Sequence, residues 1–237
     1  MNPFSGSPNS VGVSGGVFLF LLLIAFPYAT ARGHKFGRAL RLPRIALYVS
    51  SSLTLWLLIA LMIVVVHFQH QPLATTGVQN VLSTIRLAMW TGGLVLVGLL
   101  IGWLCRGLQR KRSIALSETV RHAIPRTAAE FAVFCLLLAP TAGVAEEVLF
   151  RGFVITRLSW LIGDAWPAAI VASLSFALGH VYQGWIGLLR TGLGGLAFSL
   201  AFVLTGSLLP SILAHTVLNL LSAPLFRPRD HLAPTRR

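Results

Sequence analysis

A short stretch of the chain, residues 143–152, combines the residue types best suited to chemistry. Its sequence, GVAEEVLFRG, places two of the chain's six acidic residues, Glu146 and Glu147, side by side among apolar residues. On a helix, Glu147 and Arg151 share a face and can form an ion pair, whereas Glu146 lies about 100° away around the helix. The spacing therefore leaves one carboxylate available as a general base. A structural ion pair that fixes the packing of helices is the alternative interpretation.

Two more polar clusters follow in apolar segments. Residues 176–180 read FALGH and end in His180, and residues 215–219 read HTVLN, which places His215 and Asn219 on one face of a helix. Each cluster alone is compatible with helix packing, since such residues often form hydrogen bonds between membrane helices. Together with the glutamates they supply a carboxylate, two imidazoles and an amide, which can activate water and stabilise an oxyanion. This combination favours hydrolysis of an amide bond.

Composition places the chain among integral membrane proteins. Of its 237 residues, 55% are hydrophobic and only 11% are charged. The net charge of +13 comes from basic residues clustered between apolar runs, as the positive-inside rule predicts, and basic residues do not alternate with aromatic ones as in single-strand binders. We therefore expect no nucleic-acid partner, but contacts with anionic lipid head groups. The two cysteines, both in apolar runs, exclude a disulfide scaffold.

The apolar pattern predicts an all-α fold, a polytopic membrane bundle of about seven transmembrane helices. A further amphipathic helix is predicted at the membrane interface over residues 117–130, and a short basic tail over residues 223–237. The seven predicted spans cover residues 11–29, 45–67, 87–105, 131–158, 168–182, 185–204 and 208–225.

The first span has two interpretations. The residues Ala29-Thr30-Ala31 resemble the cleavage site of a signal peptide, but no Lys or Arg precedes the apolar run, so we expect a retained span. Basic loops follow the first, third and fifth spans, the last through Arg190 alone, which predicts an N-terminus outside and a C-terminus inside.

The fourth span should be interrupted. Pro140 and Gly143 precede Glu146, and a proline inside a helix removes a hydrogen bond, so we expect a kink or break there and a polar cavity beside it. The predicted spans do not place the three motifs at the same depth in the membrane. At 1.5 Å per residue, Glu146 and His180 lie roughly 21–22 Å into their spans, but from opposite sides of the membrane. His215 lies nearer the outer end of its span. The depths coincide only if helices are broken and tilted or boundaries shift by several residues.

The three motifs, in this order, resemble those of the CPBP family of intramembrane proteases, which includes the Rce1-like CAAX prenyl proteases and the Abi proteins. The motifs are Glu146-Glu147-x-x-x-Arg151, Phe176-x-x-x-His180 and His215-x-x-x-Asn219. The flanking sequences FRG at 150–152 and TGSLLP at 205–210 fit as well. The resemblance implies a catalytic core over residues 128–222, preceded by N-terminal spans and an interfacial segment over residues 1–127.

What the resemblance implies is a glutamate-dependent intramembrane endopeptidase. Glu146 would activate water, His180 would hold that water or stabilise charge, and His215 with Asn219 would form the oxyanion site. The residues implied as supports are Glu147, Arg151 and Phe176.

The family has also been described as metalloproteases, and His and Glu suit zinc. The alternative to a metal-free site is therefore zinc bound by Glu146, His180 and His215. We expect no cofactor, because no His-Glu-x-x-His is present and the glutamate mechanism gives each group a role.

The resemblance also implies a substrate and a location. The expected substrate is a membrane-anchored protein or a lipidated peptide, and the expected location is the cytoplasmic membrane of a bacterium, as a multi-pass protein. The rival interpretation is a non-catalytic membrane scaffold or immunity protein with the same fold.

Overall fold

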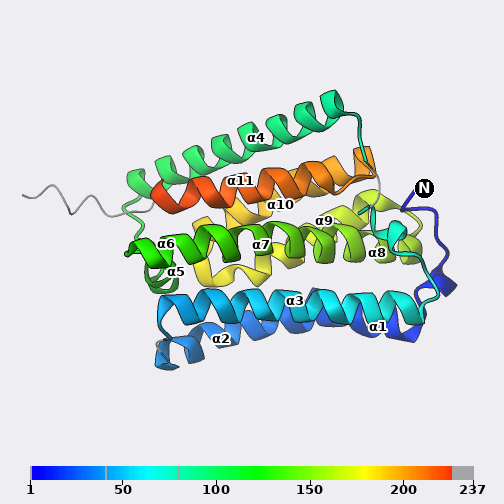
Figure 1. The fold of residues 1–237 in the computed structure, drawn as a ribbon, viewed down its shortest axis with the longest axis horizontal. Helices are drawn as coiled ribbons and strands as arrows, with labels where there is room; N and C mark the ends of the chain where they lie inside the picture. The colour runs from blue at the N-terminus through cyan, green and yellow to red at the C-terminus, as the bar shows by residue number, and fades with distance from the viewer. Residues whose placement is uncertain (1, 41, 79–80, 226–237) are drawn as a thin grey trace, which may run out of the picture.

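The computed structural model describes residues 2–40, 42–78 and 81–225, and every regular element in these ranges is a helix (Figure 1). The elements in chain order are η1 (Pro8–Ser10), α1 (Gly12–Phe20), η2 (Leu21–Ala25), α2 (Phe26–Leu40), α3 (Arg44–Phe68), η3 (Leu73–Thr76), α4 (Thr84–Lys111), α5 (Glu118–Ala123), α6 (Ala128–Val133), η4 (Phe134–Leu138), α7 (Ala139–Glu146), η5 (Glu147–Ile155), α8 (Thr156–Ile162), α9 (Ala165–Gly179), η6 (Val181–Gln183), α10 (Gly184–Thr205) and α11 (Leu209–Leu225). The basic tail beyond residue 225 lies outside the described residues.

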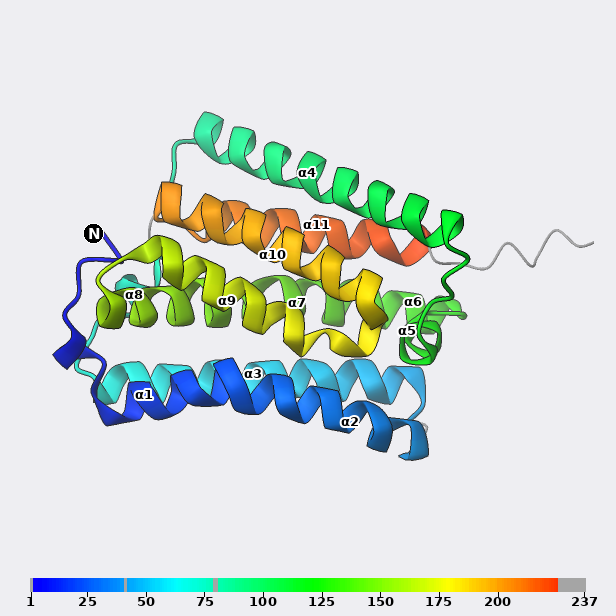
Figure 2. The ribbon, with the colours of Figure 1, turned by 180° about the vertical axis from the view of Figure 1, so that it is seen from behind.

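The long helices run side by side along one direction (Figures 1 and 2), which confirms the predicted all-α membrane bundle. Among the described residues, five helices are long and apolar enough to cross a membrane, and two shorter apolar helices lie among them. The five are Gly12–Gly33, Arg44–Phe68, Thr84–Lys111, Ala128–Ile162 and Val181–Thr205, and the two shorter ones are Ala165–Gly179 and Leu209–Ser222. Together they correspond to the seven predicted spans, with shifted boundaries.

The first apolar segment is part of the core of the bundle. α1, η2 and α2 follow one another without a break, and Phe18 and Leu22 are buried among residues of several other helices. The hydroxyl of Ser175 on α9 donates to the carbonyl oxygens of Leu22 (3.2 Å) and Leu23 (3.0 Å). These carbonyls belong to the π-helical turn η2, where the wider backbone spacing leaves oxygens open to a partner.

The helix that carries the glutamates is continuous from Ala128 to Ile162, so of the kink or break expected before Glu146 the break is absent. Pro140 lies two residues after the end of the π-helical segment η4. Such a bulge absorbs the hydrogen bond that a proline cannot make, so the chain continues as a helix. A second π-helical segment, η5, begins at Glu147, and π-bulges are frequent at functional sites.

The predicted interfacial helix over residues 117–130 is wrong in its extent. α5 ends at Ala123, the chain leaves the helix at Ile124, directly before Pro125, and residues 128–130 belong to the next helix. A new helix, α6, starts after Thr127, whose hydroxyl accepts from the backbone N–H of Glu130 (3.2 Å) while the Glu130 carboxylate accepts from the Thr127 N–H (3.1 Å). The Thr-x-x-Glu spacing is a capping-box pattern, so the start of α6 could have been predicted from the sequence.

The register between α11 and the long helix explains how distant motifs meet. The two run antiparallel, with Gly143 packed against Thr216 and Gly152 packed against Leu208. A side chain at either glycine would collide with its partner or with the neighbouring loop. This register brings His215 level with the residues just after Gly143, one turn from the glutamates.

The depths of the three motifs therefore coincide. α8 and α9 are joined by a two-residue turn, and Glu146 lies 17 residues before Gly163 while His180 lies 16 residues after Asp164. Both positions are roughly 24–26 Å from the turn along their helices. The difference in depth expected from the sequence assumed that all spans begin at the same depth in the membrane. In the structure α11 begins opposite Gly152, well before the end of α8.

A buried arginine that the sequence analysis left without a role lies near the end of this helix. Arg157 is fully buried, and donates from Nε to Oε1 of Gln69 (3.0 Å) and from Nη1 to the hydroxyl of Thr75 (3.2 Å). Its guanidinium lies 4.2 Å from the centre of the Trp160 ring, whose Nε1 donates to the carbonyl oxygen of Pro3 (3.0 Å). These contacts fasten the N-terminal segment and the loop after α3 to the end of the bundle.

Candidate active site

Glu147 and Arg151 form the ion pair that their spacing predicts. Both side chains are almost completely buried, and Arg151 Nη1 donates to Glu147 Oε1 at 3.1 Å. Arg151 Nη2 donates to the backbone oxygen of Gly195 on α10 (3.1 Å), and the guanidinium lies 4.4 Å from the centre of the Phe176 ring. The pair therefore joins three helices, and Glu147 is not available to solvent.

His215 connects the two glutamates. Its Nδ1 lies 2.8 Å from Glu147 Oε1, and its Nε2 lies 3.8 Å from Glu146 Oε2. Because a carboxylate only accepts hydrogen bonds, the short contact assigns a proton to Nδ1, which donates to Glu147. The Nε2 atom then faces Glu146.

The exposure of the two carboxylates differs in the way a general base requires. The Glu146 side chain is 17% exposed, whereas that of Glu147 is 0% exposed. A water molecule can reach Glu146 without breaking the pair between Glu147 and Arg151. The structure thus separates a held carboxylate from an accessible one.

His180 lies at the C-terminal end of α9, where Nδ1 is 2.8 Å from the carbonyl oxygen of Phe176. A carbonyl oxygen only accepts, so Nδ1 carries a proton and Nε2 is the free ring nitrogen. The ring of Phe176 lies 4.5 Å from that of His180 and 6.5 Å from that of His215. The Phe176 ring therefore lies next to both histidine rings and to the Arg151 guanidinium.

Asn219 is placed differently from the role that the resemblance implies. Its Nδ2 donates to the carbonyl oxygen of Ala139 at 3.4 Å, beside Pro140 and one turn away from His215. Within the described residues no hydrogen bond joins the Asn219 side chain to a glutamate or to a histidine. The contact fits the alternative that was considered for this residue, a hydrogen bond between packed helices.

Three residues near the site were not among the site residues predicted from the sequence. The ring of Phe198 lies 5.6 Å from that of His215 and 5.7 Å from the Arg151 guanidinium. A Cβ atom at Gly195 would lie 3.2 Å from Arg151 Nη2, so a glycine lets the guanidinium reach the backbone of α10. Tyr182 stacks at 5.8 Å on the His180 ring. Of the three, only the glycine has an indication in the sequence, because Gly187, Gly192, Gly194 and Gly195 make this span rich in glycine, which suits close helix packing.

The zinc alternative requires Glu146, His180 and His215 to converge on one point. Within the described residues, no three His, Cys, Asp or Glu side chains lie close enough together to hold a metal ion. In both histidines Nδ1 is engaged, in His215 with Glu147 and in His180 with the Phe176 carbonyl, which leaves Nε2 as the ring nitrogen that could bind a metal. The separation of the three side chains nevertheless does not fit a three-ligand zinc site within the described residues.

Comparison with known proteins adds one finding. Residues 128–221 match the family model described as type II CAAX prenyl endopeptidase Rce1-like. No curated protein and no solved structure matches the chain. The matched segment begins with α6, ends within α11 and contains every residue of the site described above.

Proposed function

Because the chain belongs to the Rce1-like family through residues 128–221, a family of proteases, we propose that it is an intramembrane endopeptidase in which Glu146 activates the attacking water. One observation carries this proposal: of two adjacent carboxylates, Glu147 is buried in an ion pair and Glu146 is reachable beside His215. A general base must lie within reach of a water molecule and of a group that orients it.

The proposed reaction is the attack of water on a peptide carbonyl. Glu146 removes a proton from the water, the oxygen attacks the carbonyl carbon, and the protonated Glu146 then donates to the leaving amine. Glu147 holds His215 in one orientation, and Arg151 in turn holds Glu147. This chain of contacts keeps the imidazole in place next to the base without exposing a second carboxylate.

The two histidines have different proposed roles because their Nδ1 atoms donate to different groups and their Nε2 atoms have different surroundings. Neutral His180 has its proton on Nδ1, so Nε2 can accept a hydrogen bond from the attacking water and hold it. The Nδ1 atom of His215 donates to Glu147, and its Nε2 atom faces Glu146 at 3.8 Å. Its proposed role is to stabilise the oxyanion through Nε2 when that nitrogen carries a proton. The proposed role of Asn219 is a further donor to the oxyanion, through the amide N–H that does not contact Ala139.

The proposed substrate is a membrane-anchored protein or a lipidated peptide. The family description names CAAX prenyl endopeptidases, and a C-terminal C-a-a-X sequence is the site of prenylation at its cysteine. The helix that carries the glutamates is apolar over a membrane-spanning length, and the helices that lead to the histidines are shorter but also apolar, which suits a lipid-anchored chain. The proposed location is a cell membrane, and a bacterial cytoplasmic membrane is the location that the sequence resemblance suggests.

The proposal is tested by the turnover of a farnesylated peptide by the purified protein in lipid nanodiscs. We expect His180→Ala and His215→Ala each to lower turnover by roughly 10²–10³, the typical loss on removing one stabilising group. The variant with both changes is expected to be little slower than either single variant, because the groups act on one step. His215→Ala should also lower thermal stability, since it removes the partner of the buried Glu147.

Asn219→Ala is the matched control, because Asn219 lies on the same helix face as His215 but its side chain contacts the Ala139 carbonyl, away from the glutamates. Its loss of turnover should be clearly smaller. Two results together would contradict the roles proposed for His180 and His215. The losses of turnover would multiply in the double variant, and the two single variants would have the same thermal stability.

A separate measurement concerns metal. We expect the purified, active protein to contain no stoichiometric zinc by elemental analysis and to keep its activity after prolonged chelation. If the protein contains stoichiometric zinc, and activity is lost on chelation and restored only by added metal, then Glu146 is a zinc ligand and not the base that activates water.

A further inference from the structure

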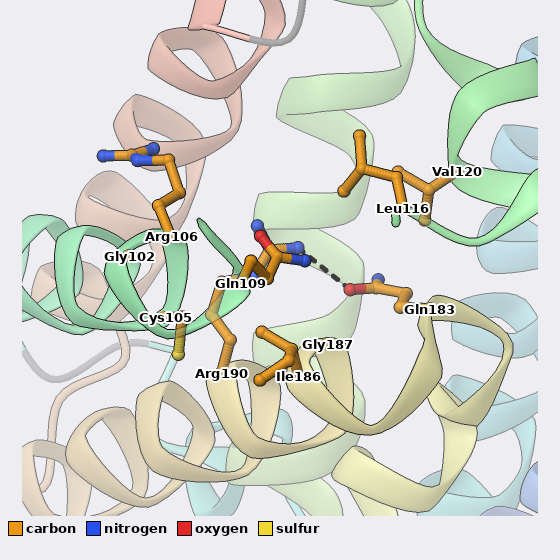
Figure 3. A pocket seen from close by; sticks show the side chains of 10 residues that line it. All are labelled: Gly102, Cys105, Arg106, Gln109, Leu116, Val120, Gln183, Ile186, Gly187 and Arg190. Carbon is orange, nitrogen blue, oxygen red and sulfur yellow. Dashed lines mark hydrogen bonds between the residues drawn. The ribbon is translucent and has the colours of Figure 1, made fainter. Parts of the chain in front are cut away.

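A glutamine and an arginine beside the candidate active site have a fixed orientation. Gln183 and Arg190 line a small cavity outside the glutamate site, between the first turns of α10 and the last turns of α4 (Figure 3). Arg190 Nη2 donates to Gln183 Oε1 at 2.9 Å. A guanidinium only donates hydrogen bonds, so this contact assigns the two ends of the Gln183 amide, with Oε1 towards Arg190 and Nε2 free to donate elsewhere.

The amide nitrogen of Gln183 donates to the hydroxyl of Tyr182. The distance between Gln183 Nε2 and Tyr182 Oη is 3.4 Å. The phenol oxygen is the acceptor in this contact, so the proton of the hydroxyl remains for another partner. Within the part of the chain that the structure describes, this hydroxyl donates to no protein group. The O–H bond can rotate towards a substrate while the oxygen keeps its contact with Gln183.

The Tyr182 side chain borders the groups that are proposed to react. Its ring lies 5.8 Å from that of His180, with 33° between the ring planes. Glu146 is one of the two carboxylate or guanidinium groups whose charge acts on the Tyr182 hydroxyl, and Arg190 is the other. The side chain is partly exposed, so a ligand can reach it. Tyr182 is therefore next to both groups that are proposed to hold the attacking water.

The oxyanion site described so far has conditional donors. His215 donates from Nε2 only when that nitrogen carries a proton, because its Nδ1 atom donates to Glu147. The Asn219 amide contacts the carbonyl oxygen of Ala139, one turn away from His215. A phenol O–H, by contrast, is a donor over the whole physiological pH range. Tyr182 thus has the type of donor that this site otherwise has only under conditions.

We propose that Tyr182 is a further catalytic residue, whose hydroxyl donates a hydrogen bond to the carbonyl oxygen of the bond that is cut. The contact strengthens as this oxygen becomes an oxyanion. Tyr182 keeps its proton throughout, so the proton transfers through Glu146 are unchanged. Gln183 is a positioning residue that holds the phenol oxygen and is itself oriented by Arg190. This inference rests on the proposed peptidase function.

The competing role for Tyr182 is packing alone, with its ring supporting that of His180. Both roles need the ring, but only the proposed role needs the hydroxyl. A contact that is stronger in the transition state than in the bound substrate raises kcat and leaves KM nearly unchanged. The two roles therefore differ in what removal of a single oxygen atom does to kcat.

The first test measures turnover of a farnesylated peptide by Tyr182→Phe in lipid nanodiscs. We expect kcat to fall by roughly 10², the typical loss on removing one oxyanion donor, with KM close to the wild-type value. The loss should exceed that of Asn219→Ala. Tyr48→Phe is the matched control, because the Tyr48 hydroxyl donates to the carbonyl oxygen of Ala123 at 2.7 Å, away from the site, and it should keep the wild-type kcat.

A third variant at this position distinguishes the hydroxyl from the ring. Tyr182→Leu loses both, and its kcat should be lower than that of Tyr182→Phe. If Tyr182→Phe keeps the wild-type kcat while Tyr182→Leu loses activity, the residue only packs against His180 and the inference is wrong.

The role of Gln183 is tested by a double variant. Gln183→Met keeps the length of the side chain but removes both of its hydrogen bonds, and its loss of kcat should be smaller than that of Tyr182→Phe. The variant with both changes should be little slower than Tyr182→Phe alone, because both residues act through one hydroxyl. Losses that multiply would overturn the positioning role of Gln183.

A binding measurement separates this inference from the proposed function. The probe is a farnesylated peptide in which a phosphinate, a charged tetrahedral group, replaces the amide that is cut. Tyr182→Phe should bind this probe more weakly than the wild type by about the factor lost in kcat/KM. In the Glu146→Gln protein, by contrast, adding Tyr182→Phe should leave the affinity for the uncleaved peptide unchanged.

The outcomes of this measurement are distinct. Equal affinity of the wild type and Tyr182→Phe for the phosphinate would overturn the role of Tyr182, while cleavage of the peptide by the wild type would retain the peptidase. A wild-type protein that neither cleaves the peptide nor prefers the phosphinate to it would reject the peptidase, and the role of Tyr182 with it.

Discussion

Replacing Glu146 with glutamine is expected to abolish peptide cleavage while the protein still inserts and folds. Glutamine keeps the shape of the side chain but cannot take a proton from water, and loss of a general base typically costs roughly 10²–10⁴ in rate. The Glu146 side chain is partly exposed, and its closest charged contact is His215 at 3.8 Å, so the substitution should disturb little else. Cleavage of a farnesylated peptide and thermal unfolding in detergent are measured on the same preparation.

The same variant provides the control for finding natural substrates. Membrane peptides that appear in cells with the wild-type protein, and not in cells with Glu146→Gln, are candidate products. A variant that folds and retains wild-type turnover would rule out Glu146 as the base and would redirect attention to Glu147.

This substitution also separates the two classes of function. A scaffold or immunity protein with the same fold depends on its shape and surface, neither of which Glu146→Gln changes appreciably. If cells carrying the variant keep the wild-type phenotype, the non-catalytic interpretation is favoured. If they behave like cells lacking the protein although the variant is present at normal levels in the membrane, the phenotype depends on catalysis.

The ion pair of the site could be predicted from spacing alone. Glu147 and Arg151 are four residues apart on a helix, and this local relation determines their contact wherever the helix lies in the bundle. Their burial followed as well, because an apolar sequence surrounds them. Local rules also placed His215 and Asn219 on one face of α11.

The contact between His215 and the glutamates was not predictable by such rules. It depends on where α11 starts relative to the long helix, which is fixed by Gly152 packing against Leu208 and Gly143 against Thr216. Hydropathy marks only the apolar length of each span and carries no information about its offset from its neighbours. The predicted depths therefore failed to coincide although the motifs meet in space.

Other features of the site depend on tertiary packing and left no mark in the sequence. Phe198 is one of 14 phenylalanines, and nothing in its surroundings indicates that its ring contacts His215. The π-helical segments before Pro140 and after Glu146 were also unexpected, since the proline predicted a break. A bulge and a break differ in how the neighbouring helices support the backbone, which a single sequence does not reveal.

Glu147→Gln is expected to lower the stability of the protein strongly, in contrast to Glu146→Gln. Glu147 is the acidic partner of Arg151, both side chains are almost fully buried, and the carboxylate also accepts from His215. Breaking a buried pair by removing one partner typically costs roughly 3–5 kcal/mol, because the remaining charge is left uncompensated. Activity should fall as well, since His215 loses the contact that orients it. The midpoint of thermal unfolding in detergent measures the difference between the two variants.

A double variant isolates the charge from the shape of the site. Glu147→Gln combined with Arg151→Met removes both charges, so no unpaired guanidinium remains in the bundle, and replacement of a buried pair by apolar groups is often nearly neutral. We therefore expect the double variant to unfold at a higher temperature than Glu147→Gln alone, while remaining inactive because His215 is still released. Should the single variant prove as stable as the wild type, the pair would not support the site, and Glu147 would be as free as Glu146 to act on water. Because both single variants are expected to lose activity, the difference in stability is the measurement that distinguishes the supporting glutamate from the reacting one.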